Sequence, residues 1–88
     1  MSFYISFQSE LTKSILQIAD SYANKVDSLV CFHYGQAMAF TKMLNNFYPG
    51  EFSKEQANLR ESIHQQIKAR YGETIYLNLK EEYLNQII

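Results

Sequence analysis

Residues 45–56, Asn-Asn-Phe-Tyr-Pro-Gly-Glu-Phe-Ser-Lys-Glu-Gln, contain the only proline of this 88-residue chain. Proline disfavours a helical backbone at the residue before it, and the glycine that follows is a second helix breaker. Apolar side chains recur at helical spacing on both sides of this stretch. Pro49-Gly50 therefore predicts the end of one helix and the reversal of the chain into the next.

Upstream of this turn, apolar residues recur every three or four positions from residue 9 to residue 47, and we expect them to face the core. They are Leu11, Ile15, Ile18, Ala19, Tyr22, Val26, Leu29, Phe32, Ala39, Phe40, Met43, Leu44 and Phe47. This pattern allows two interpretations. One is a single long helix over 9–47. The other is two helices, 9–26 and 28–48, divided near Asn24 to Ser28, where Asn, Asp and Ser side chains compete for backbone hydrogen bonds and Asp27 suits a helix cap. We favour two helices, because a lone helix of about 39 residues would leave much of its apolar side uncovered.

Downstream of the turn, two further helices are predicted, at 53–71 and 74–87. Ser53 and Gln56 have the spacing of a capping box, in which each side chain satisfies a backbone N–H at the start of the helix. Gly72 suits the left-handed backbone position that often ends a helix. The residues predicted to face the core from these two helices are Leu59, Ile63, Ile67, Ile75, Leu79, Tyr83 and Ile87.

A competing interpretation places short strands at 3–7 and 75–79, where apolar and polar residues alternate. An isolated two-stranded ribbon is only marginally stable in water, and 75–79 also fits a helix. We therefore expect an all-α fold, a small bundle of three to four helices formed by residues 1–88 as a single domain.

The composition indicates an ordinary folded domain without a strong charge. The net charge is −1 and 47% of the residues are apolar, so no global field attracts the chain to nucleic acid or to an anionic membrane. No window reaches the ~18 apolar residues of a membrane span, and the N-terminal residues lack the basic start of an export signal. The single cysteine, Cys31, lies in an apolar run and is expected to be a buried, reduced thiol, which fits the cytoplasm.

The spacing of the candidate residues does not favour a metal site or an enzyme active site. Cys31 and His33 are two positions apart on a predicted helix and point away from each other, while His64 stands alone, so we expect no metal site. The three glycines are far apart and lack the motif of a phosphate-binding loop. We expect no catalytic residues and no cofactor.

A protein-binding surface is the first functional hypothesis. Tyr34, Gly35, Met38, Tyr48 and Tyr76 fall on or beyond the edges of the predicted core stripes, and Tyr and Met are enriched at protein interfaces. Gly35 also makes its helix thin enough for a second helix to approach closely. These residues predict a non-enzymatic interaction module, an adaptor, regulator or inhibitor of a protein partner of unknown identity, that forms a homodimer.

The alternative is a nucleic-acid-binding regulator. Arg60, His64, Lys68 and Tyr71 are spaced so that they share about 80° of arc on the third predicted helix. Basic and aromatic side chains on one helix face suit contacts to phosphates and bases, or to an acidic partner. The slightly acidic total charge favours the protein-binding hypothesis.

Overall fold

The computed structural model describes residues 3–88, and every element in this part of the chain is helical. The elements are α1 (Tyr4–Ala23), α2 (Asp27–Phe47), α3 (Pro49–Tyr71), α4 (Glu73–Leu79), the π-helix η1 (Lys80–Leu84) and α5 (Asn85–Ile87). The last three follow one another without a break and act as one fourth helix. The expected all-α class is confirmed.

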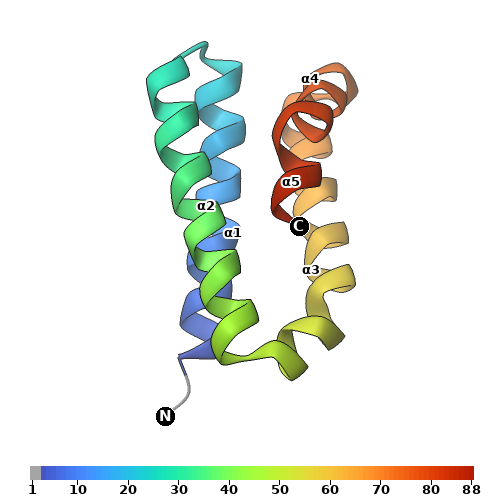
Figure 1. Ribbon diagram of the computed structural model, residues 1–88. Coiled ribbons are helices and arrows are strands. Elements are labelled where there is room, and N and C mark those ends of the chain that lie inside the picture. Colours follow the sequence, from blue (N-terminus) through green and yellow to red (C-terminus); the bar gives the residue numbers. More distant parts are fainter. Residues whose placement is uncertain (1–2) are drawn as a thin grey trace.

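The helices form two hairpins placed side by side (Figure 1). α1 and α2 run antiparallel and share the most extensive packing in the molecule. α3 and the C-terminal segment α4–α5 form the second hairpin, which contacts the first through both α1 and α2. The chain crosses from one hairpin to the other at Tyr48, so the turn at Pro49 is where the prediction placed it.

Residues between α1 and α2 form a short turn, which confirms two helices over residues 9–47. Lys25 takes a left-handed backbone conformation with φ of 60°, and the side-chain amide of Asn24 donates to the carbonyl of Asp20 at 2.9 Å. The expected cap at Asp27 is wrong, because α2 is preceded by Val26 and no side chain caps its start. The turn is therefore held from the α1 side.

α1 begins at Tyr4, before the predicted start at Ser9, and the strand alternative for 3–7 and 75–79 is wrong because both segments are helical. The ring of Tyr4 packs against Tyr48 at 5.5 Å between centroids, and Phe7 packs there at 6.2 Å. Aromatic packing against the end of α2 extends the helix beyond the point that local signals indicate.

α3 also begins before its predicted start. Pro49 occupies the first helical position, where its missing N–H leaves no bond unmade. Tyr48 just before it has φ of −135° and ψ of 51°, outside the helical region. The capping box at Ser53 is wrong, since no side-chain cap forms, and the earlier start places Phe52 in a helical turn where its ring is fully buried.

The second hairpin turns at Gly72, whose φ of 90° is favourable only for glycine. After it, Leu79 and Leu84 are both fully buried although they lie five positions apart. A regular α-helix would separate them by about 140° around the axis, whereas a π-helical turn accommodates one extra residue. The π-helix at Lys80–Leu84 thus keeps both leucines on the core side.

The core lies between the two hairpins. Its buried apolar residues are Tyr4, Leu11, Ile15, Ile18, Ala19, Val30, Ala37, Leu44, Phe52, Ile63, Ile67, Tyr76, Leu79, Leu84, Ile87 and Ile88. The predicted core positions of α1 and α3 are largely among them. Most of the apolar positions of α2 are not.

Candidate protein-interaction surface

Large apolar side chains line the outer side of α2. Phe32 is 58% exposed and Phe47 68% exposed, and both Leu29 and Met43 are exposed as well. Together with the exposed Ala39, they recur at steps of three, seven, four and four residues along one side of the helix. We call the set Leu29, Phe32, Ala39, Met43 and Phe47 the outer stripe.

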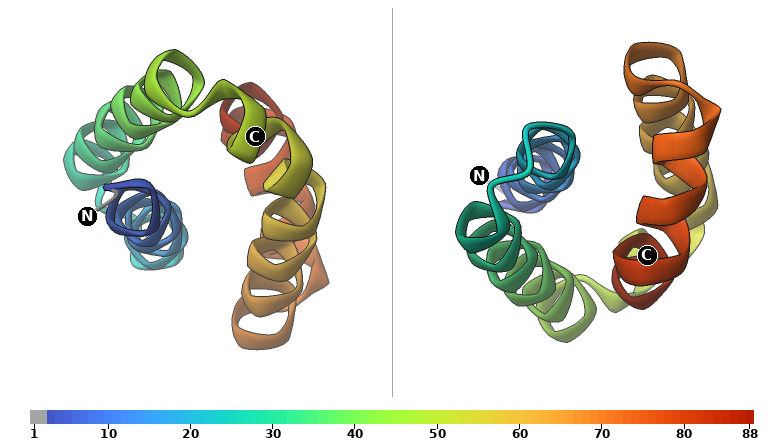
Figure 2. Two further views of the ribbon diagram at one scale, coloured as in Figure 1. Left: turned by 90° about the horizontal axis from the view of Figure 1, so that it is seen from below. Right: turned by 90° about the horizontal axis from the view of Figure 1, so that it is seen from above.

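The exposure follows from how α2 packs. Val30, Ala37 and Leu44 are buried at seven-residue intervals and form a narrow line toward the first hairpin and the core. The outer stripe lies about 100° away around the helix axis. α2 lies at one edge of the molecule (Figure 2), with α1 as its main neighbour. Only one side of its wide apolar arc is therefore buried.

α2 is also poor in charge. Asp27 and Lys42 are its only charged residues, and neither belongs to the outer stripe. Depletion of charge together with exposed Phe, Met and Leu is the compositional signature of the centre of a protein interface, in contrast to an ordinary solvated helix face. The sequence interpretation assigned Leu29, Phe32, Met43 and Phe47 to the core. The low charge of this segment was the signal that could have separated them.

Gly35 and Met38, two residues of the predicted interface, lie on the surface of α2. A Cβ placed on Gly35 would meet nothing within 4 Å. Met38 lines a shallow groove of about 460 Å³ on the same helix, whose other lining residues are Ala39, Thr41, Lys42 and Asn45. Ala39 belongs both to the groove and to the outer stripe, so the two features adjoin.

The three tyrosines predicted for the interface lie further inward. Tyr34 is half-buried and its hydroxyl donates to Gln86 at 2.6 Å, which joins α2 to the C-terminal segment. Tyr48 is half-buried against α1. Tyr76 is only 7% exposed and its hydroxyl lies 2.8 Å from Nδ1 of His64, so its expected surface position is wrong.

His64 was predicted on a basic, solvent-facing strip but is only 4% exposed. Its imidazole contacts Tyr76, while Nε2 is buried without a hydrogen-bond partner. Burial first, and then the positive charges of Arg60, Lys80 and Lys68, lower the pKa of His64 below its usual 6.5. Lys68 lies over the Tyr76 ring, 5.0 Å from its centroid. This part of α3 therefore faces the C-terminal segment.

The remaining residues of the strip make contacts within the chain as well. Arg60 donates from Nε to the carbonyl of Ile88 at 3.1 Å, which ties the C-terminus to α3. Tyr71 donates its hydroxyl to the carboxylate of Asp20 at 3.2 Å, across to α1. Arg60, His64, Lys68 and Tyr71 are close together as predicted, but they hold elements of the fold together instead of forming one open face.

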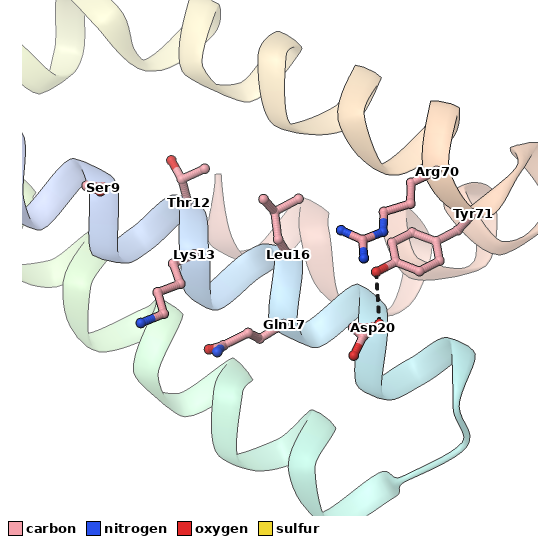
Figure 3. Close-up of a pocket in the computed structure, with 8 residues that line it drawn as sticks. All are labelled: Ser9, Thr12, Lys13, Leu16, Gln17, Asp20, Arg70 and Tyr71. Carbon is pink, nitrogen blue, oxygen red and sulfur yellow. Dashed lines mark hydrogen bonds between the residues drawn. The ribbon is translucent and has the colours of Figure 1, made fainter.

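A second groove, of about 550 Å³, lies between α1 and the end of α3 (Figure 3). Its lining residues are Ser9, Thr12, Lys13, Leu16, Gln17, Asp20, Arg70 and Tyr71. The Tyr71–Asp20 hydrogen bond closes one end, and the guanidinium of Arg70 lies 5.6 Å from the Tyr71 ring centroid. The groove combines both signs of charge with one leucine, which suits solvent or a loosely held polar chain more than a defined ligand.

Cys31 is exposed on α2, and the expectation of a buried thiol is wrong. The cysteine lies outside the buried line of α2, which only Val30, Ala37 and Leu44 form. Within residues 3–88, no three His, Cys, Asp or Glu side chains gather as a metal ion requires.

Over the same residues, no helix has the length and apolar character to cross a membrane. No protein-family model matches this chain, and no curated protein or solved structure is significantly similar to it.

Proposed function

We propose that this protein is a small, non-enzymatic protein-interaction module, an adaptor, regulator or inhibitor, that binds its partner through the outer stripe of α2. The observation that supports the proposal is the exposure of Leu29, Phe32, Met43 and Phe47 along one side of a helix that carries only two charged residues. Exposed apolar residues scattered singly need no explanation, whereas a continuous set on one helix face marks an interaction surface.

Burial of this face would favour binding. Full burial of a Leu, Phe or Met side chain contributes about 1.5–3 kcal/mol, and the four large residues of the outer stripe retain between a third and two thirds of their exposure. Association also costs several kcal/mol in lost freedom of motion. We therefore expect a reversible complex, in which Phe32 and Phe47, the most exposed aromatic residues of α2, contribute most to binding.

A nucleic-acid partner receives less support. Lys42 is the only basic residue of α2, so the outer stripe offers few contacts to phosphates. The four residues of the predicted basic strip are engaged with Ile88, Tyr76 and Asp20. We also propose a cytoplasmic location, because the chain has a single cysteine, Cys31, and so cannot form an internal disulfide.

A photo-crosslinking amino acid at position 32 tests the proposal in living cells of the native host. Covalent adducts with protein are expected when it replaces Phe32. The matched control replaces Gln65, an exposed residue on the outer side of α3, and is expected to give none. Equal labelling at both positions, or no adduct at position 32, would contradict a binding role for the outer stripe.

A further inference from the structure

We infer that the outer stripe binds the same stripe of a second copy of this chain, with the two α2 helices antiparallel and related by a two-fold axis centred between positions 37 and 38. The inference rests on the proposed function and names its partner. Three features of α2 lead to it: the spacing of its exposed residues, the position of its charges and the length of the stripe.

The spacing is that of a coiled-coil seam. The seam positions are Leu29, Gln36 and Met43 in one series with a seven-residue repeat and Phe32, Ala39 and Asn46 in the other, and Phe47 of the outer stripe flanks them. Such a seam favours near-parallel axes, about 20° apart, over a steep crossing. The stripe therefore fits a straight helix of about the same length along most of α2.

The two series are also self-complementary. An antiparallel two-fold axis at 37.5 exchanges one series with the other, so that an isologous contact matches the same patch on both copies. Phe32 of one copy then faces Met43 of the other, and Gln36 faces Ala39. Phe32 thus meets a flexible side chain and Gln36 meets a small one. Both pairs let the two helix axes approach closely near the two-fold axis.

Gln36 supplies a polar group near the axis. Its side-chain oxygen lies 3.0 Å from Nδ1 of His33 and is therefore partly oriented within the monomer. Asn46 is the second polar residue of the seam, and in the same register it faces Leu29 of the other copy.

The charges of α2 permit the pairing. In the antiparallel register, the two copies of Lys42 lie about 13 Å apart along the axis and the two copies of Asp27 about 31 Å apart. Both separations exceed the screening length of about 8 Å at physiological salt. No like charges are opposed, and no charge is buried at the seam.

Other occupants fit less well. An amphipathic helix that binds an anionic membrane carries Lys and Arg along its polar face, whereas α2 has Lys42 alone. The stripe from Leu29 to Phe47 is about 27 Å long, so a single helix pair buries an area at the low end of specific interfaces. We therefore expect a reversible dimer whose fraction rises with concentration in the micromolar range.

Sedimentation equilibrium of the purified chain, from low micromolar to several hundred micromolar, tests the dimer. The mass is expected to rise from 10.3 kDa toward twice that value. Phe32→Asp is expected to raise the dissociation constant by about 30-fold or more, while the control Gln65→Asp leaves it unchanged. Circular dichroism of both variants verifies that the helices are retained. A monomer at every concentration would overturn the inference.

Disulfide formation tests the register without disturbing Phe32. In a Cys31→Ser background, one chain carries Leu29→Cys and another Asn46→Cys. Oxidation of the mixture is expected to give the mixed disulfide. Neither variant alone should form one efficiently, because the two copies of residue 29 would lie about 25 Å apart along the axis, far beyond disulfide reach. A disulfide between two copies of residue 29, or none in the mixture, would overturn the antiparallel register.

The two hypotheses fail in different ways. A monomeric chain that still crosslinks from position 32 to another protein overturns the self-association and leaves the proposed function in place. A monomeric chain without any adduct at position 32 overturns both.

Discussion

α2 and α3 are helices of 21 and 23 residues joined through Tyr48, yet the surfaces that they present to solvent differ in chemical character. α2 exposes Leu29, Phe32, Met38, Met43 and Phe47, whereas α3 exposes no large apolar side chain. The charged residues of α3 are Glu51, Lys54, Glu55, Arg60, Glu61, Lys68 and Arg70, against Asp27 and Lys42 in α2. The outer face of α3 is polar although it belongs to the same small protein. The small size of the chain therefore does not explain the apolar outer face of α2.

Removing one aromatic ring from each helix gives the largest contrast. Phe52→Ala in α3 is expected to lower the free energy of unfolding by about 3–5 kcal/mol, because its ring is fully buried and a cavity replaces it. Phe32→Ala in α2 is expected to lower it by less than about 1 kcal/mol, since most of that ring is already in water.

Urea denaturation at a protein concentration low enough to keep the chain monomeric measures both values. The same experiment at high concentration is expected to widen the loss for Phe32→Ala, because the proposed dimer would stabilise the folded wild type more than the folded variant. Similar losses for the two variants at low concentration would show that Phe32 belongs to the core, and the comparison of the two helices would fail.

The sequence predicted where the helices end better than it predicted which of their side chains are buried. Pro49 and Gly72 end helices through local backbone preferences, which are readable without a structure. The early helix starts at Tyr4 and Pro49 depend on packing against Tyr48 and on the burial of Phe52, which no local signal reveals.

The candidate site was harder still. Periodicity shows that α2 has a wide apolar arc but not which part of it a neighbour covers, so the outer stripe was assigned to the core. Conversely, spacing correctly grouped Arg60, His64, Lys68 and Tyr71, but it could not show that His64 is buried against Tyr76 or that Tyr71 binds Asp20 of α1.

Acidification should affect the inner side of α3. The pKa of His64 is lowered by burial and then by nearby cations, so between that lowered pKa and 6.5 the unfolded chain binds more protons than the folded one. The contribution of His64 to stability is therefore complete above pH 6.5 and is lost as the pH falls toward the lowered pKa.

Urea denaturation of the wild type and of His64→Gln, at about pH 7.5 and about pH 5, measures this effect. The variant is expected to lose less stability on acidification than the wild type does. Gln65→Ala, which changes the outer side of the same helix and keeps His64, is expected to retain the full loss. An equal loss in His64→Gln and wild type would assign the pH dependence to other groups.

Alkaline conditions test the contact between the two hairpins. Tyr4 of α1 donates its hydroxyl to Glu55 of α3 at 2.9 Å. Burial first, and then the hydrogen bond and negative charge of Glu55, raise the pKa of Tyr4 to about 12. Its contribution to stability is present below pH 10 and is lost as the pH rises from 10 through about 12.

Tyr4→Phe removes this hydroxyl and is expected to lower the free energy of unfolding by about 1–2 kcal/mol at neutral pH. The variant is also expected to lose stability less steeply above pH 10. The slope should not vanish, because burial also raises the pKa of Tyr22, Tyr71 and Tyr83. Thermal unfolding followed by circular dichroism at neutral and alkaline pH measures both effects, and an unchanged alkaline slope would argue against the Tyr4–Glu55 bond.

The smallest effects come from two glycines, one in each helical hairpin. Gly35 is exposed inside α2 in a helical conformation, and a methyl group there would meet nothing within 4 Å. Gly35→Ala is expected to raise the free energy of unfolding by about 0.5–1 kcal/mol, because alanine restricts the unfolded chain and favours the helix. Gly72 has equal space but a φ of 90°, so Gly72→Ala is expected to lower the free energy of unfolding by about 1 kcal/mol or more. Opposite signs, measured by thermal unfolding of dilute protein, would show that backbone conformation and not free space distinguishes the two sites. If Gly35→Ala instead destabilises the chain, α2 is not a regular helix around position 35. The seven-residue spacing on which the proposed seam depends would then not hold.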